Sequence, residues 1–173
     1  MIGNGLPPVH ALLSGGVALD NISFSVDVTS QAPADPFASL RTLVNSGRIQ
    51  QAEANKLTGN MMGIVGAGLK WIFGYRDAIH AGTLSGAHGL GLDDQVGSLK
   101  PGKRADVILV RTDAPNMLPA ANTNPTYQLV QHGEPANVDT VIIDGIIRKR
   151  AGKLTGFDVA AVIERAAEAQ MDI

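Results

Sequence analysis

The chain has 173 residues, 45% of them hydrophobic and 17% charged, which is typical of a globular protein rather than a disordered one. Its formal net charge of −2 leaves no excess of Lys or Arg to neutralise phosphates, so an electrostatic nucleic-acid binder is excluded. The absence of cysteine excludes disulfides, thiolate zinc sites and a thiol nucleophile. We see no secretory signal and no apolar run near the ~20 residues that span a bilayer, and therefore expect a cytoplasmic protein with no membrane partner.

The first part of the chain is predicted to be mainly helical, with one strand. Apolar and polar residues alternate over 21–28, which indicates a strand with Asp27 at its C-terminal end. Asp35 and Pro36 are typical of a helix N-cap and first turn, and the apolar spacing extends this helix to about Gln51 or beyond. The Gly- and Met-rich stretch 53–74 predicts no single structure. Shorter helices are expected at 7–15, 75–82 and 85–90, with a bend near Gly82-Thr83.

The remainder is predicted to contain a small β layer. Asp144-Gly145 between two β-branched runs is a hairpin signal. The expected strands are 106–110, 138–143 and 146–150, and the expected helices are 125–131 and the amphipathic 157–170. We place a domain boundary near residue 95, which divides the chain into 1–95 and 96–173.

One run in the chain resembles a known family. The segment contains Gly86-Ala87, Leu90-Gly91-Leu92, Gly97-Ser98-Leu99, Pro101-Gly102-Lys103 and Ala105-Asp106. It resembles the C-terminal part of the amidohydrolase superfamily, in the branch of cytosine deaminases, chlorohydrolases and adenosine-deaminase-like enzymes. Residues 138–145 are similar to that family's final hairpin, and residues 7–27 to its approach to barrel strand eight.

The resemblance implies a mixed α/β fold: the truncated end of a TIM barrel over 1–95, then part of a composite β-sandwich with a terminal helix over 96–173. It also implies a function, hydrolysis of C–N bonds with Zn (or Fe) in the complete family members. By the same resemblance Asp27 is the strand-eight aspartate, a metal ligand and catalytic residue that takes a proton from the attacking water. Without the resemblance, Asp27 is equally read as a strand-end residue that caps the next turn.

The rest of the family's metal site has no match in this sequence. The four histidines, His10, His80, His88 and His132, include no His-x-His pair, and the strand-five Glu has no counterpart. One carboxylate does not hold a catalytic zinc, which takes about three protein ligands. We therefore expect the isolated chain to bind no cofactor and to be inactive.

Other motifs have simpler readings than a binding site. The glycines of 82–91 fit neither the P-loop nor the dinucleotide fingerprint, so helix packing is favoured. The basic turn 100–104 either touches an anion or, as Pro-Gly favours, is a solvated turn. His80 and His88 are expected to be packing or surface histidines rather than a shared metal site, and Trp71, Phe73 and Tyr75 to lie in a core or interface.

Two functions from different classes remain. In the first, the chain is the C-terminal portion of a metal-dependent, deaminase-like amidohydrolase that acts only with an upstream portion. In the second, it is a non-catalytic module derived from that family that associates with itself. Residues 105–150 are expected to form half a sandwich with an apolar face and open edges, so we expect a homo-oligomer or a missing N-terminal portion as partner.

Overall fold

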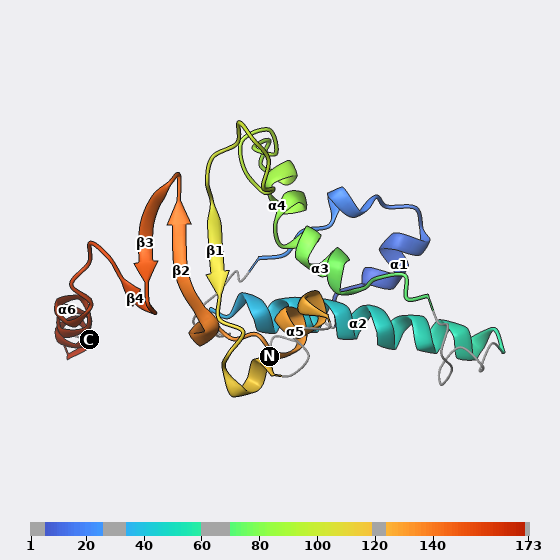
Figure 1. The fold of residues 1–173 in the computed structure, drawn as a ribbon. Helices are drawn as coiled ribbons and strands as arrows, with labels where there is room; N and C mark the ends of the chain where they lie inside the picture. Colours follow the sequence, from blue (N-terminus) through green and yellow to red (C-terminus); the bar gives the residue numbers. More distant parts are fainter. Residues whose placement is uncertain (1–5, 26–33, 60–69, 119–123, 172–173) are drawn as a thin grey trace.

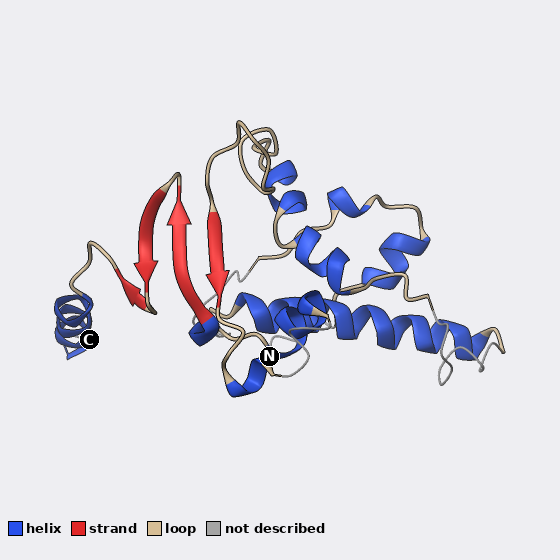
Figure 2. Cartoon of the chain, viewed as in Figure 1, coloured by secondary structure: helices blue, strands red, loops and turns tan. Residues whose placement is uncertain are grey.

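The protein is described by a computed structural model covering residues 6–25, 34–59, 70–118 and 124–171. Helices α1 to α5 form a body on one side, a sheet lies beside it, and helix α6 lies beyond the far edge of the sheet (Figures 1 and 2). The fold is mixed α/β, as predicted, and its one described sheet is small and antiparallel. The division at residue 95 stays a prediction.

The longest helix, α2 (Pro36–Leu57), begins where the sequence predicts. The Asp35 side chain accepts hydrogen bonds from the backbone N–H groups of Phe37 (2.9 Å) and Ala38 (3.2 Å). Pro36 fits the first turn because its missing N–H would have no partner there. In the described ranges, neither α2 nor any other helix has the length and apolar character needed to cross a membrane.

The core lies where α2 meets the shorter helices. α1 (Val9–Ser14), α3 (Tyr75–Ala81) and α5 (Pro125–His132) all pack near it. Gly47 permits the close approach of α1, because a Cβ there would lie 3.4 Å from Phe73 and 3.5 Å from Val9. The buried cluster is built from Val9, Leu40, Leu43, Val44, Phe73, Ala78, Ala81 and Val130.

The predicted strand 21–28 is wrong for its described part. Asn21 ends a short 3-10 helix, η1 (Leu19–Asn21), and residues 22–25 are extended but belong to no sheet; Val26, Asp27 and Val28 lie outside the described residues. The apolar side of this segment packs on helices instead of entering a ladder. Ile22 is buried, and the Phe24 ring lies so close to Gly82 that a Cβ there would be 2.6 Å from it.

The predicted bend near Gly82-Thr83 is confirmed. Helix α3 ends with Gly82 as its C-cap, and α4 (Leu84–Gly89) begins after Thr83. Ser85, buried in α4, donates a hydrogen bond from its hydroxyl to the Leu19 carbonyl (3.1 Å). This bond ties α4 to η1 and fixes the direction of the chain after the bend.

The sheet is four-stranded, antiparallel and ordered β1-β2-β3-β4. The hairpin prediction is confirmed: Asp144 (φ 52°) and Gly145 (φ 77°) form the two-residue turn, and positive φ at both positions suits the twist of the paired strands. Short 3-10 turns, η3 (Pro115–Met117) and η5 (Pro135–Asn137), connect the sheet to α5. The strands are β1 (Val107–Val110), β2 (Val138–Ile143), β3 (Ile146–Arg150) and β4 (Lys153–Leu154).

Helix α6 (Val159–Met171) confirms the predicted amphipathic C-terminal helix. Its apolar stripe, however, is not buried: Val162 is 48% and Ile163 63% exposed. The helix lies apart from the helical body in Figure 1, so its apolar side faces solvent in this structure.

Candidate functional site

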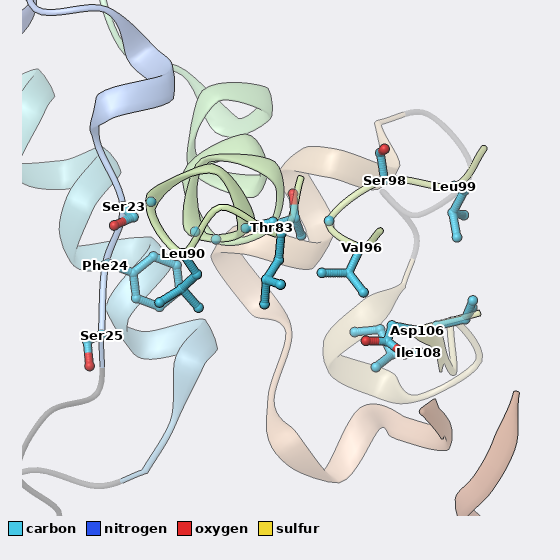
Figure 3. Close-up of a pocket in the computed structure, with 17 residues that line it drawn as sticks. Ser23, Phe24, Ser25, Thr83, Leu90, Val96, Ser98, Leu99, Asp106 and Ile108 are labelled. Atoms are coloured by element: carbon cyan, nitrogen blue, oxygen red, sulfur yellow. The ribbon is translucent and has the colours of Figure 1, made fainter. Parts of the chain in front are cut away.

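An open cleft of about 820 Å³ separates the sheet from the helical body. One wall is the start of β1, with Asp106, Val107 and Ile108; the other is the extended segment 23–25 and the α3–α4 bend (Figure 3). The glycine-rich run after α4 closes one end. The lining is mainly apolar, from Phe24, Leu90, Leu92, Val96, Leu99 and Ile108, with hydroxyls from Ser23, Ser25, Thr83 and Ser98.

The end of the cleft is shaped by Gly97. Its φ of +83° lies in the left-handed region, and a Cβ there would be 2.7 Å from the Ala87 Cβ. The turn therefore packs directly on α4, at a distance that no side chain allows. This is the physical reason for glycine at this position of the run that resembles the amidohydrolase family.

Lys103 holds the same turn together. Its ammonium group donates hydrogen bonds to the Ser98 hydroxyl (2.7 Å), the Val96 carbonyl (3.2 Å) and the Asp93 carbonyl. A lysine whose donors are used on backbone carbonyls is not free to bind an anion. Of the two readings of the 100–104 turn, the anion site is thus disfavoured, and the solvated-turn reading needs correction at Lys103, which is half-buried.

The end of the run is tied to the hairpin. The Asp106 carboxylate accepts a hydrogen bond from the Asp144 backbone N–H (2.7 Å), and the Gly145 N–H donates to the Ala105 carbonyl (3.1 Å). Arg104 and Asp144 form an exposed ion pair at 3.6 Å. Residues 97–106 thus connect the α4 side of the cleft to the β2–β3 turn, and their contacts are structural rather than catalytic.

The histidines do not converge. His80 contacts the Asp20 carboxylate at 2.6 Å, His88 lies 3.7 Å from Asp93, and His132 lies 3.3 Å from the Tyr127 hydroxyl. His10 is on α1, 3.4 Å from Ser14. Within the described ranges no three His, Asp or Glu residues are grouped to hold a metal ion. The prediction of separate packing or surface histidines is confirmed.

Asp27, the one predicted metal ligand and catalytic residue, lies outside the described residues. Its assignment stays a prediction. The described residues alone do not fit a zinc site, since they bring together no three suitable donors.

A cation–aromatic cluster next to the core was missed by sequence reasoning. The Arg48 guanidinium lies 5.1 Å from the centroid of the Trp71 ring and 4.4 Å from that of Tyr75, and it donates to the Tyr75 hydroxyl (2.7 Å). Tyr75 also meets Tyr127 edge to face at 5.1 Å. The rings are used for packing between helices, as expected, and the only available signal was an arginine in an otherwise apolar part of α2.

The charged groups with clearly shifted pKa values lie away from the cleft. Arg111 and Asp113 form a two-bond pair at 3.0 Å just after β1. The hydrogen bond from Arg111 lowers the pKa of Asp113, and the same bond raises the pKa of Arg111. Both side chains are exposed, so this pair closes a turn and does not mark an active site.

Sequence comparison gives a family. Residues 7–148 match the model of the amidohydrolase family. The 5-methylthioadenosine/S-adenosylhomocysteine deaminase of Desulforudis audaxviator is 30% identical over 168 residues, which cover 95% of this chain and 34% of that protein. The 5'-deoxyadenosine deaminase of Methanothermobacter thermautotrophicus is 30% identical over 173 residues, or 99% of this chain and 35% of that protein.

Solved structures share the fold. An adenosine deaminase of Xanthomonas campestris with bound zinc has a TM-score of 0.62 at 24% identity, covering 79% of this chain and 27% of that one. The zinc complex of an atrazine chlorohydrolase of Arthrobacter aurescens TC1 has a TM-score of 0.70 at 17% identity, covering 96% and 33%. This chain spans about a third of the length of the curated relatives it matches.

Proposed function

This chain belongs to the amidohydrolase family, and from that premise we propose that it is the C-terminal portion of a metal-dependent deaminase that acts only together with an upstream portion. The match to a third of the length of its relatives carries the proposal. The described residues support it, because they contain no group of three metal-binding side chains. The remaining ligands must then come from elsewhere.

The substrate class follows from the relatives. Their names specify 5'-deoxyadenosine and 5-methylthioadenosine or S-adenosylhomocysteine as substrates. We propose that the assembled enzyme hydrolyses the C–N bond to the exocyclic amine of a 5'-substituted adenosine. Water supplies the oxygen that replaces the amine, and the amine leaves as ammonia.

Asp27 is proposed as the one residue of the reaction centre that this chain contributes. Its neighbour along the chain, Ser25, lines the cleft. The other proposed features, Zn in the assembled enzyme and no cofactor in the isolated chain, agree with the zinc named for two structural neighbours.

The test is an ammonia-release assay with 5'-deoxyadenosine and zinc. The purified chain should show no turnover, and adding the polypeptide encoded directly upstream, if it carries His-x-His, should produce it. In the assembled enzyme Asp27→Asn should abolish turnover. Asp20→Asn, which removes an exposed partner of His80 instead, should retain it. Turnover by the isolated chain, or by the Asp27→Asn assembly, would refute the proposal.

A second candidate, a non-catalytic module that associates with itself, is favoured by one observation: the apolar side of α6 is exposed at Val159, Val162 and Ile163. Native mass spectrometry with zinc present separates the two candidates. A metal-free homo-oligomer that ignores the upstream polypeptide supports the module. A chain that combines with that polypeptide and then holds zinc supports the deaminase.

A further inference from the structure

The two edges of the sheet differ in their protection. β4 ends the sheet with only two residues, Lys153 and Leu154, and follows a strand that carries Arg148, Lys149 and Arg150. Short length and lysine or arginine side chains are the features that keep an edge from pairing with another strand. β1 reads Val-Ile-Leu-Val over 107–110 and has none of them, so it is the edge open to a further strand.

The backbone of β1 has hydrogen-bonding groups to offer on its outer side. The Arg111 N–H donates to the Asn137 carbonyl (2.8 Å), and the Ala105 carbonyl accepts from the Gly145 N–H (3.1 Å), so both positions point toward β2 and its hairpin. Backbone groups alternate in direction along an antiparallel strand. Residues 106, 108 and 110 therefore point outward, and no strand of the described part of the chain pairs with them.

The side chains of β1 are uncovered on both faces of the sheet. Ile108 is 50% and Leu109 52% exposed, and successive residues of a strand point to opposite faces. Covering one face alone would leave the other exposed. A strand added beside β1 covers part of both, because its own side chains alternate in the same way.

The cleft lies along this open edge. Figures 1 and 3 show β1 facing the helical body, with Ile108 on one side of the cleft and Phe24 and Leu90 on the other. An extended segment here would bond to β1 along one edge and meet apolar side chains of the body along the other. A second copy fits poorly, because pairing two β1 edges would bring the partner's β2 toward the helical body.

We infer that the open edge of β1 is the joint for one extended strand of the upstream portion, which pairs with the backbone at 106, 108 and 110 and fills the cleft. The inference rests on the proposed function for the existence of that portion. The solved neighbour with a TM-score of 0.74 matches 96% of this chain but has only 32% of its own chain in the match, so related proteins carry further chain to cover such a surface.

The chain offers a matched pair of variants for the test. Ile108 and Leu154 lie on opposite edges of the sheet and are 50% and 53% exposed. With the upstream polypeptide as titrant, Ile108→Lys should raise the Kd about tenfold or more, since a charge on an edge opposes pairing. Leu154→Lys, the same change on the other edge, should leave the Kd within about twofold. Circular dichroism of both variants establishes that they are folded.

Amide hydrogen exchange followed by NMR locates the joint. In the free chain, the amides of Ile108 and Val110 should exchange faster than those of Val107 and Leu109, and the complex should slow the first two. A complex without that protection, or equally weakened by both variants, would refute the joint and keep the proposed function. No complex with the upstream polypeptide would refute both. Protection at 108 and 110 in a dimer of the free chain would assign the edge to a second copy.

Discussion

The helical body and the sheet of this protein bury their apolar residues to very different degrees. In the body, Phe73 and Val9 are each 1% exposed, and Val44 and Val130 are fully buried. In the sheet and α6, Leu109 is 52%, Ile146 52% and Phe157 65% exposed. Since burial of apolar surface is the main force that favours folding, the body contains its own source of stability, whereas the sheet and α6 depend on covering from outside.

The largest expected effect tests that difference directly. Phe73→Ala should lower the free energy of unfolding by about 3–5 kcal/mol, because it removes a buried ring and leaves a cavity. Phe157→Ala, the same substitution at a 65% exposed position, should change it by about 0.5 kcal/mol or less. Urea unfolding followed by circular dichroism at 222 nm measures both. Equal losses would mean that the sheet region is covered in solution.

A pair of glycines separates close packing from backbone strain. Gly97 and Gly102 both have positive φ, +83° and +89°, but only Gly97 has atoms close to the place of a Cβ. Gly97→Ala should cost about 2 kcal/mol or more, from strain plus the contact with Ala87. Gly102→Ala should cost about 1 kcal/mol, from strain alone. Thermal unfolding of the two variants gives the difference, and a difference near zero would show that the turn on α4 yields freely.

Helix caps compare the two regions at equal chemistry. Asp35 accepts from the Phe37 N–H at the start of α2, and Asp158 accepts from the Ala161 N–H (3.1 Å) at the start of α6. Asp35→Ala should lower the global free energy of unfolding by about 1 kcal/mol. Asp158→Ala should leave the unfolding midpoint unchanged and speed amide exchange only in α6. A shift of the midpoint by both variants would show that α6 unfolds with the body.

The smallest expected effect is electrostatic. Because the folded-state pKa of Asp113 is lowered, first by its hydrogen bond from Arg111, the pair's contribution to stability is present above the unfolded pKa of ~3.9 and is lost as pH falls through the folded pKa. Arg111→Gln should raise the Asp113 pKa toward ~3.9. An NMR titration of the carboxyl carbon measures it. Arg165→Gln, on α6, should leave that titration unchanged.

Local signals in the sequence predicted most of the elements. Asp35-Pro36 and Asp144-Gly145 work because a cap and a tight turn are decided by a few adjacent residues. The strand over 21–28 was wrong for residues 21–25 because alternation predicts a pleated segment but not a neighbouring strand to pair with. In this structure, Phe24 uses its apolar side against Gly82 instead.

The site was less predictable than the fold. The bonds from Lys103 to the carbonyl groups of its own turn leave no periodic pattern, so a basic turn was expected where a clamp exists. The cleft depends on distant segments, since Phe24 and Ile108 meet only through the arrangement of the whole chain. Asp27 was assigned by resemblance alone, and the described residues leave that prediction untested.

The position of the single tryptophan has a consequence for spectroscopy. Trp71 lies against Arg48 of α2 and two residues before the buried Phe73, so its emission reports the helical body. The sheet and α6 have no tryptophan and are silent in that signal. If they loosen before the body does, the fluorescence and the far-ultraviolet transitions of one sample will occur at different denaturant concentrations, and a two-state fit to either curve will be unjustified.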